Sequence, residues 1–163
     1  MTIGCSLLGF GRIGKIHYQN ILNSSRYNRF KLSYIVERHS ELERINNELQ
    51  DSYFSKEIKV IHEFDLVLKD PNIKCVIICT PTHMHFSNIM DCLNHGKHVF
   101  CEKPIDESLE NIRICYDTAK EKKLHLFCAF NRRFDNKIAE LKTNINCIGN
   151  INQIISITRD YPY

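Results

Sequence analysis

Three glycines near the start of the chain have the spacing of a phosphate-binding turn. Gly9, Gly11 and Gly14 lie in the segment GFGRIG, between an apolar run and a helical pattern. In such a turn the first glycine permits the bend, the second lets the backbone approach a diphosphate, and the third lets the helix pack closely. The helix N-terminus offers N–H groups and a partial positive charge. The spacing therefore predicts a dinucleotide-binding turn.

An acidic residue follows at the separation that a ribose-binding carboxylate needs. Glu37 ends the next apolar run, close to the roughly 20 residues expected after the glycine turn. A carboxylate there accepts hydrogen bonds from ribose hydroxyls and repels a 2′-phosphate, which favours NAD. The neighbouring Arg38 could instead receive that phosphate. NADP therefore stays possible.

These residues need a sheet that brings them to one edge. Apolar runs predict strands over residues 3–8, 31–36, 59–61, 74–79, 98–101 and 124–129. Amphipathic segments between them predict helices over residues 12–23, 41–49, 64–68, 85–93 and 109–122. This alternation predicts an α/β fold with a doubly wound parallel sheet, the Rossmann dinucleotide-binding fold.

Short clusters of polar residues, glycines and prolines follow the predicted strands. In open parallel sheets, ligands bind beyond the carboxyl ends of the strands. The later clusters are TPTHMH from Thr80 to His85, EKP from Glu102 to Pro104, and NRRFD over residues 131–135. Together with the glycine turn and Glu37, they predict one site along the carboxyl edge of the sheet.

The pattern changes after residue 130. Residues 135–141 predict a helix, and residues 151–158 (INQIISIT) predict one alternating strand. We therefore expect a Rossmann domain over 1–130, and over 131–163 a linker helix and only the first strand of a second α+β domain. Such an unpaired apolar strand would invite pairing with a second copy of the chain or a partner chain.

Composition limits the classes of function. The 163 residues are 43% hydrophobic and 25% charged, as in ordinary soluble proteins. The net charge of +3 does not favour nucleic acid or membrane binding. No run has the length of a transmembrane helix, and the N-terminus lacks the features of a signal peptide. The eight cysteines, without a C-x-x-C pair, are then expected to be reduced thiols in the cytoplasm.

A metal site is the alternative use of the central histidines and cysteines. Zinc sites usually contain tight pairs such as C-x-x-C, which this sequence lacks. Two of the candidate ligands also fall in strands that we expect to be buried. We therefore assign no metal ligand among Cys79, His83, His85, His95, His98 and Cys101.

Four segments together resemble a known family. They are GFGRIGKIH, VIICTPTHMH, GKHVFCEKPI and FNRRFD. Their order and spacing resemble the N-terminal nucleotide-binding domain of the Gfo/Idh/MocA (glucose–fructose oxidoreductase/inositol dehydrogenase) family, most of all its inositol dehydrogenase-like branch. The resemblance implies hydride transfer between NAD(P) and a hydroxyl or carbonyl group of a sugar or cyclitol.

The resemblance also implies roles for single residues. The diphosphate would lie against the glycine turn, and the adenosine ribose against Glu37. The nicotinamide end would lie along the two later clusters, and a basic residue would border the substrate. The residues concerned are Gly9, Phe10, Gly11, Arg12 and Ile13 for the diphosphate; Thr80, Pro81 and His85 for the nicotinamide ribose; Glu102, Lys103 and Pro104 beside the nicotinamide; and Arg132 or Arg133 for the substrate.

Lys103 is the residue to which the resemblance gives a catalytic role. While hydride leaves a carbinol carbon for the nicotinamide, a proton leaves the oxygen. An ammonium group near that oxygen stabilises the developing negative charge and helps to relay the proton. Pro104 would stiffen the turn, as a cis peptide bond can.

The expected partner of Lys103 is not found in this sequence. In the family, the lysine acts with an aspartate and a histidine, or an equivalent acid/base, from a second domain. No histidine follows His125. The chain therefore resembles half of an NAD(P)-dependent dehydrogenase. The alternative is a truncated, inactive nucleotide-binding module that acts through a partner chain, so enzyme activity of this chain itself stays open.

Overall fold

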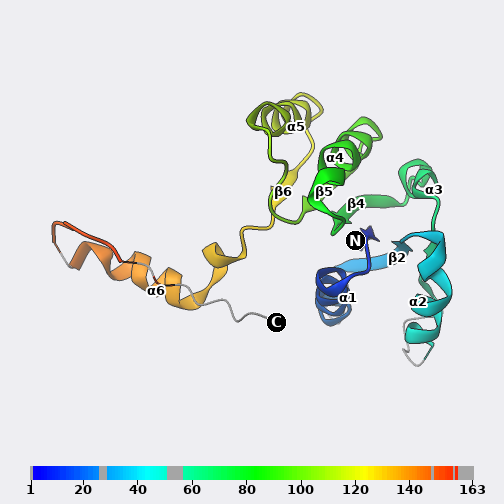
Figure 1. Ribbon diagram of the computed structural model, residues 1–163, viewed down its shortest axis with the longest axis horizontal. Coiled ribbons are helices and arrows are strands. Elements are labelled where there is room, and N and C mark those ends of the chain that lie inside the picture. The colour runs from blue at the N-terminus through cyan, green and yellow to red at the C-terminus, as the bar shows by residue number, and fades with distance from the viewer. Residues whose placement is uncertain (1, 26–28, 51–56, 148, 156, 158–163) are drawn as a thin grey trace. The chain divides into compact units, whose positions relative to one another are not determined.

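Six parallel strands form a sheet in the order β3-β2-β1-β4-β5-β6 (Figure 1). This computed structural model describes the chain except residues 1, 26–28, 51–56, 148, 156 and 158–163. The order confirms the predicted α/β fold with a doubly wound parallel sheet. The strands are β1 (Ile3–Leu8), β2 (Phe30–Val36), β3 (Lys59–Ile61), β4 (Ile73–Ile78), β5 (His98–Cys101) and β6 (Leu126–Cys128).

Helices cover both faces of this sheet. On one face lie α1 (Arg12–Ser25) and α2 (Leu42–Leu49) (Figure 1). On the other lie α3 (Phe64–Lys69), α4 (His85–Asn94) and α5 (Leu109–Glu121). Short 3-10 turns, η1 (His39–Glu41) and η3 (Thr82–Met84), follow β2 and β4. None of the helices in the described ranges is long and apolar enough to cross a membrane.

The two faces carry separate apolar clusters. Leu7 of β1 packs with Ile45 of α2 on the first face, whereas Leu8 packs with Val76 of β4 and Ile89 of α4 on the second. Each fully buried side chain of this size contributes about 1.5–3 kcal/mol. Burial on both faces explains why the sequence around β4 is a nearly continuous apolar run.

Ser6 places a hydroxyl inside this core. Its side chain is 0% exposed, and its Oγ has no hydrogen-bond partner among the described residues. An unpaired buried polar group costs about 1–3 kcal/mol. We expect Ser6→Ala to raise the free energy of unfolding by about 1 kcal/mol in urea denaturation.

Ser108→Ala is the matched control for this prediction. The Ser108 Oγ accepts a hydrogen bond from the Asn111 N–H at the start of α5. Loss of an N-cap costs about 1 kcal/mol, so this serine should give a change of the opposite sign. A lower urea midpoint for Ser6→Ala would show that its hydroxyl is satisfied.

The chain divides into two units, Met1–Ala129 and Phe130–Tyr163. The second unit contains η4 (Asn131–Phe134), α6 (Asn136–Asn144) and η5 (Ile145–Cys147). Asp135 caps α6, since its Oδ1 accepts hydrogen bonds from the N–H groups of Lys137 and Ile138. The helix predicted over residues 135–141 is therefore confirmed.

The strand predicted over residues 151–158 is wrong for the part that the structure describes. Residues 151–155 and 157 form no strand, and residues 156 and 158 lie outside the described ranges. A strand is stabilised by hydrogen bonds to a neighbour. In the described residues this segment pairs with no other strand, so alternation of apolar residues alone does not produce one.

Candidate functional site

The glycine turn joins β1 to the N-terminus of α1. Gly9 has φ +94°, and a Cβ on it would lie 2.8 Å from the carbonyl oxygen of Cys79. A Cβ on Gly14 would overlap the carbonyl oxygen of Gly9. Around Gly11, by contrast, a Cβ would meet nothing within 4 Å. The first and third glycines therefore allow the bend and the close packing, and the second leaves open space beside the backbone.

A cleft of about 990 Å³ opens at the carboxyl edge of the sheet. Its volume lies at the upper end of the about 300–1,000 Å³ typical of small-molecule sites. Of the predicted cofactor-binding residues, those that line it are Gly11, Arg12, Ile13, Glu37, Arg38, Thr80 and Pro81. Residues without an earlier assignment line it too, among them His39, His62, Phe64, His83, Met84 and Asn88.

This cleft suits a dinucleotide. The first turn of α1 borders it, and the N–H groups of a first helical turn have no acceptor within the helix. The open space at Gly11 lets a diphosphate come close to them. Glu37 supplies a carboxylate for ribose hydroxyls at the end of β2. The residues present therefore fit the group that the sequence predicts.

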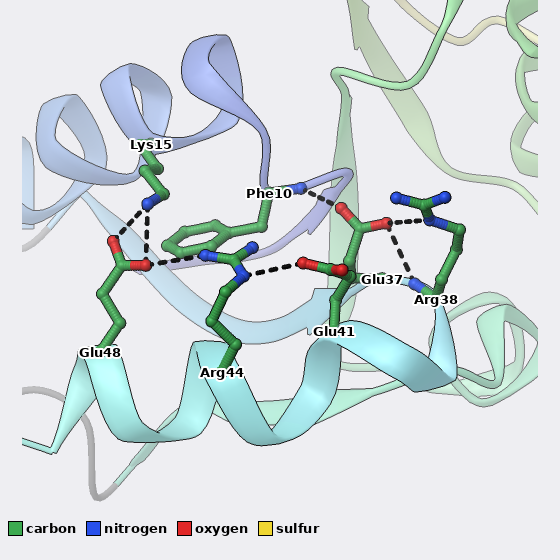
Figure 2. A network of polar contacts seen from close by, with 7 residues as sticks. All are labelled: Phe10, Lys15, Glu37, Arg38, Glu41, Arg44 and Glu48. Carbon is green, nitrogen blue, oxygen red and sulfur yellow. Dashed lines mark hydrogen bonds and ion pairs between the residues drawn. The ribbon is translucent and has the colours of Figure 1, made fainter.

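Glu37 is fixed by hydrogen bonds to the backbone (Figure 2). Its Oε2 accepts the Phe10 N–H at 2.8 Å, and its Oε1 accepts the Arg38 N–H at 3.0 Å. The Arg38 Nε lies 3.7 Å from the same Oε1. The Glu37 side chain is 18% exposed and that of Arg38 is 79% exposed. A ligand in the cleft would meet a well-ordered carboxylate and a solvated guanidinium.

The contacts of Phe10 lie within the protein, and its predicted place against the diphosphate stays a prediction. Its ring is buried and packs edge-on against Tyr18, with 5.5 Å between ring centroids. Its backbone N–H donates a hydrogen bond to the Glu37 Oε2. Phe10, Gly9 and Gly14 do not line the cleft. They shape the turn, while Gly11, Arg12 and Ile13 face the ligand space.

Ion pairs connect the first two helices beside the turn (Figure 2). Glu48 of α2 pairs with Lys15 of α1 at 2.6 Å and with Arg44 at 3.0 Å. Arg44 also pairs with Glu41 at 2.7 Å, and this carboxylate raises the pKa of the guanidinium. These side chains are substantially exposed, so solvent screens the pairs and each contributes little to stability.

The turn after β5 carries Lys103. The Glu102 Oε2 accepts the Lys103 N–H at 3.3 Å, and the Lys103–Pro104 peptide bond is cis, as the sequence suggested. The Lys103 side chain is exposed. Glu102, Lys103 and Pro104 do not line the 990 Å³ cleft. Their predicted place beside a nicotinamide stays a prediction.

His17 makes a contact with the turn after β5 that the sequence did not reveal. Its Nε2 lies 2.8 Å from the Glu102 Oε1, and its ring packs against Phe100 with 5.2 Å between centroids. The pair links α1 to the EKP turn and is only about one-fifth exposed. The two residues are 85 positions apart, so no local pattern could have joined them.

His85 is buried, and its predicted place along the nicotinamide ribose stays a prediction. It is 1% exposed and is absent from the cleft lining. Its ring nitrogens lie 2.7 Å from the backbone oxygens of Thr80 and Pro104. One turn later, the Asn88 Nδ2 donates to the Thr80 Oγ1 at 3.1 Å. Two residues of α4 therefore hold the loop that follows β4.

The two arginines that were predicted to border the substrate belong to the second unit, Phe130–Tyr163. Arg132 and Arg133 lie on η4 and are exposed. The Arg133 guanidinium lies 5.9 Å from the centroid of the Phe134 ring. Their expected role at the substrate end stays a prediction.

No group of three or more potential metal ligands comes together among the residues that the structure describes, the central histidines and cysteines included. Burial raises the pKa of the Cys79 thiol to about 12, and it also raises the pKa of Cys101.

Comparison with known proteins identifies the family of this chain. Residues 3–130 match the family model described as an oxidoreductase family with an NAD-binding Rossmann fold, Gfo/Idh/MocA. A myo-inositol 2-dehydrogenase of Thermotoga maritima is 32% identical over 142 residues, which are 87% of this chain and 40% of that protein. A scyllo-inositol 2-dehydrogenase (NADP(+)) of Bacillus subtilis is 30% identical over 89% of this chain and 38% of its own length.

A solved structure shows the same fold. Scyllo-inositol dehydrogenase from Lactobacillus casei, with bound NAD(H) and scyllo-inositol, has a TM-score of 0.75 and 30% identity over 90% of this chain and 42% of that one. This chain thus spans about two-fifths of the relatives that it matches. It belongs to the Gfo/Idh/MocA oxidoreductase family and comprises the NAD(P)-binding Rossmann domain.

Proposed function

We propose that the chain is the cofactor-binding part of an inositol dehydrogenase-like enzyme that transfers hydride between NAD(P) and a sugar- or cyclitol-type hydroxyl or carbonyl group. The observation that supports this most is the cleft at the carboxyl edge, where Gly11, Glu37 and Thr80 converge. The names of its relatives specify inositols as substrates and both NAD(+) and NADP(+) as cofactors. The bound nicotinamide would supply the hydride acceptor or donor.

The cleft and the Lys103 turn each have a role in this proposal. The backbone around Gly11 and the N-terminus of α1 bind the diphosphate. Glu37 accepts hydrogen bonds from the adenosine ribose, and Thr80 and Pro81 orient the nicotinamide ribose. Lys103 then stabilises negative charge on the substrate oxygen and relays its proton.

The second unit has a role of its own. Residues 131–163 would be the linker helix and the beginning of the substrate domain, where Arg132 or Arg133 borders the substrate. The alternative is a nucleotide-binding module that acts through a partner chain or a second copy. The exposed isoleucines that such a partner would cover are Ile151, Ile154, Ile155 and Ile157.

The test of the reaction is an assay of the protein produced from its complete gene. With NAD+ and myo- or scyllo-inositol, we expect NADH formation that Lys103→Met abolishes while NAD+ binding is retained. The exposed Lys120→Met is the control and should leave the rate unchanged. Binding of NAD+ without turnover of any inositol or sugar would favour the binding-module alternative.

Cofactor choice provides a separate prediction. We expect NAD+ to bind more tightly than NADP+, because the fixed Glu37 carboxylate repels a 2′-phosphate. Glu37→Gln removes the charge but keeps an oxygen that can accept the Phe10 N–H. It should raise NADP+ affinity about tenfold, which corresponds to ~1.4 kcal/mol of relieved repulsion. Titration of both cofactors into both proteins measures this, and unchanged relative affinities would contradict it.

A further inference from the structure

His85 joins two loops that the proposed function uses separately. It is the first residue of α4 and is 1% exposed. Its Nε2 lies 2.7 Å from the backbone oxygen of Thr80, which lines the cleft. Its Nδ1 lies 2.7 Å from the backbone oxygen of Pro104, next to Lys103. One side chain thus bridges the cofactor cleft and the lysine turn.

The two contacts indicate which ring nitrogens of His85 carry a hydrogen. A carbonyl oxygen accepts hydrogen bonds and cannot donate them. A neutral imidazole carries one N–H and one bare nitrogen, so it could satisfy only one of the two oxygens. The other nitrogen would then point a lone pair at a carbonyl lone pair. Both contacts become favourable only when both ring nitrogens carry hydrogen.

We infer that His85 is doubly protonated and acts as a positioning residue, whose two N–H groups hold the Thr80 loop and the Lys103–Pro104 turn at a fixed separation. Burial and the start of a helix both disfavour a positive charge on His85, and the two charge-assisted hydrogen bonds oppose these effects. The inferred protonation stands on geometry alone. Its consequence for Lys103 rests on the proposed function.

The bridge predicts communication between the cofactor and the lysine. Thr80 is held twice from α4, by His85 through its carbonyl and by Asn88 through its hydroxyl. A cofactor that contacts Thr80 therefore acts on a loop that is tied to the Lys103 turn through His85. Glutamine at position 85 has donors at only one end, so it cannot bond to both carbonyls in the same way.

The protonation is tested by nuclear magnetic resonance on the cofactor-free protein with ¹⁵N-labelled histidine. We expect both ring nitrogens of His85 to show directly bonded hydrogens at neutral pH. A single protonated nitrogen would overturn the inference. This measurement needs neither cofactor nor turnover, so its outcome is independent of the proposed function.

The coupling is tested by adding NAD+ to wild-type and His85→Gln proteins and following the Lys103 amide signal. We expect the signal to shift in the wild type, and the shift at saturating NAD+ to be smaller in His85→Gln, together with an about tenfold loss of affinity. His95→Gln is the matched control, because His95 lies at the exposed C-terminal end of the same helix. An unchanged Lys103 shift in a folded His85→Gln protein would overturn the coupling.

The outcomes separate the two proposals. If wild-type protein does not bind NAD+, the proposed function fails, while the protonation of His85 is still decided by its own spectrum. If His85→Gln does not fold, the wild-type spectrum again decides whether both nitrogens donate. A neutral His85 ring in that spectrum would overturn the inference even when NAD+ binds.

Discussion

Gly11→Ala is expected to weaken NAD+ binding by about tenfold to a hundredfold while leaving the fold almost unchanged. The added methyl group meets no atom of the protein within 4 Å, but it occupies the space through which a diphosphate would approach the backbone. Loss of one charge-assisted hydrogen bond costs about 1.5–3 kcal/mol, and each 1.4 kcal/mol is roughly a tenfold change in affinity.

Two measurements are needed for this variant. Calorimetric titration gives the affinity for NAD+, and urea denaturation gives the free energy of unfolding. Because Gly11 precedes the first residue of α1, alanine there removes a tolerated N-cap residue and lowers stability by at most about 1 kcal/mol. Unchanged affinity would show that the diphosphate does not pass over Gly11.

Gly14→Ala, unlike Gly11→Ala, is expected to cause a large loss of stability. Its methyl group would overlap the carbonyl oxygen of Gly9, a backbone atom that cannot move without shifting α1 away from β1. Overpacking of this kind costs about 3 kcal/mol, which lowers the melting temperature by about 6–12 °C for a chain of this size.

Gly4→Ala is the control for a defect of stability alone. A methyl group on Gly4 would overlap the Asn72 carbonyl oxygen near the start of β1, at the edge of the sheet opposite the cleft. We expect it to destabilise the protein while the folded fraction still binds NAD+ normally. A Gly14→Ala protein with the same urea midpoint as the wild type would contradict the prediction. It would show that α1 does not depend on close packing at Gly14.

Much of the fold was predictable because its signals are local. Apolar runs marked all six strands, including the nearly continuous run at β4, which is buried on both faces. Since parallel strands align their carboxyl ends, clusters far apart in sequence could be assigned to one edge of the sheet. Gly11, Glu37 and Thr80 do line one cleft.

Contacts that depend on three-dimensional packing could not be predicted in this way. His17 and Glu102 are 85 positions apart, and neither lies in a pattern that points to the other. His85 belongs to a recognisable cluster, but only the folded chain shows that its ring is buried between two carbonyl oxygens. In the described part of residues 151–158 the expected strand is absent, because pairing depends on a neighbour, which alternation in sequence does not supply.

Binding of NAD+ to this chain, measured by isothermal titration calorimetry, is the most direct test of the account. We predict saturable binding of one NAD+ per chain, tighter than that of NADP+ and weakened by Gly11→Ala. Circular dichroism would verify that each protein is folded. A folded chain that binds neither NAD+ nor NADP+ would contradict the assignment of the cleft at Gly11 and Glu37 as a dinucleotide site.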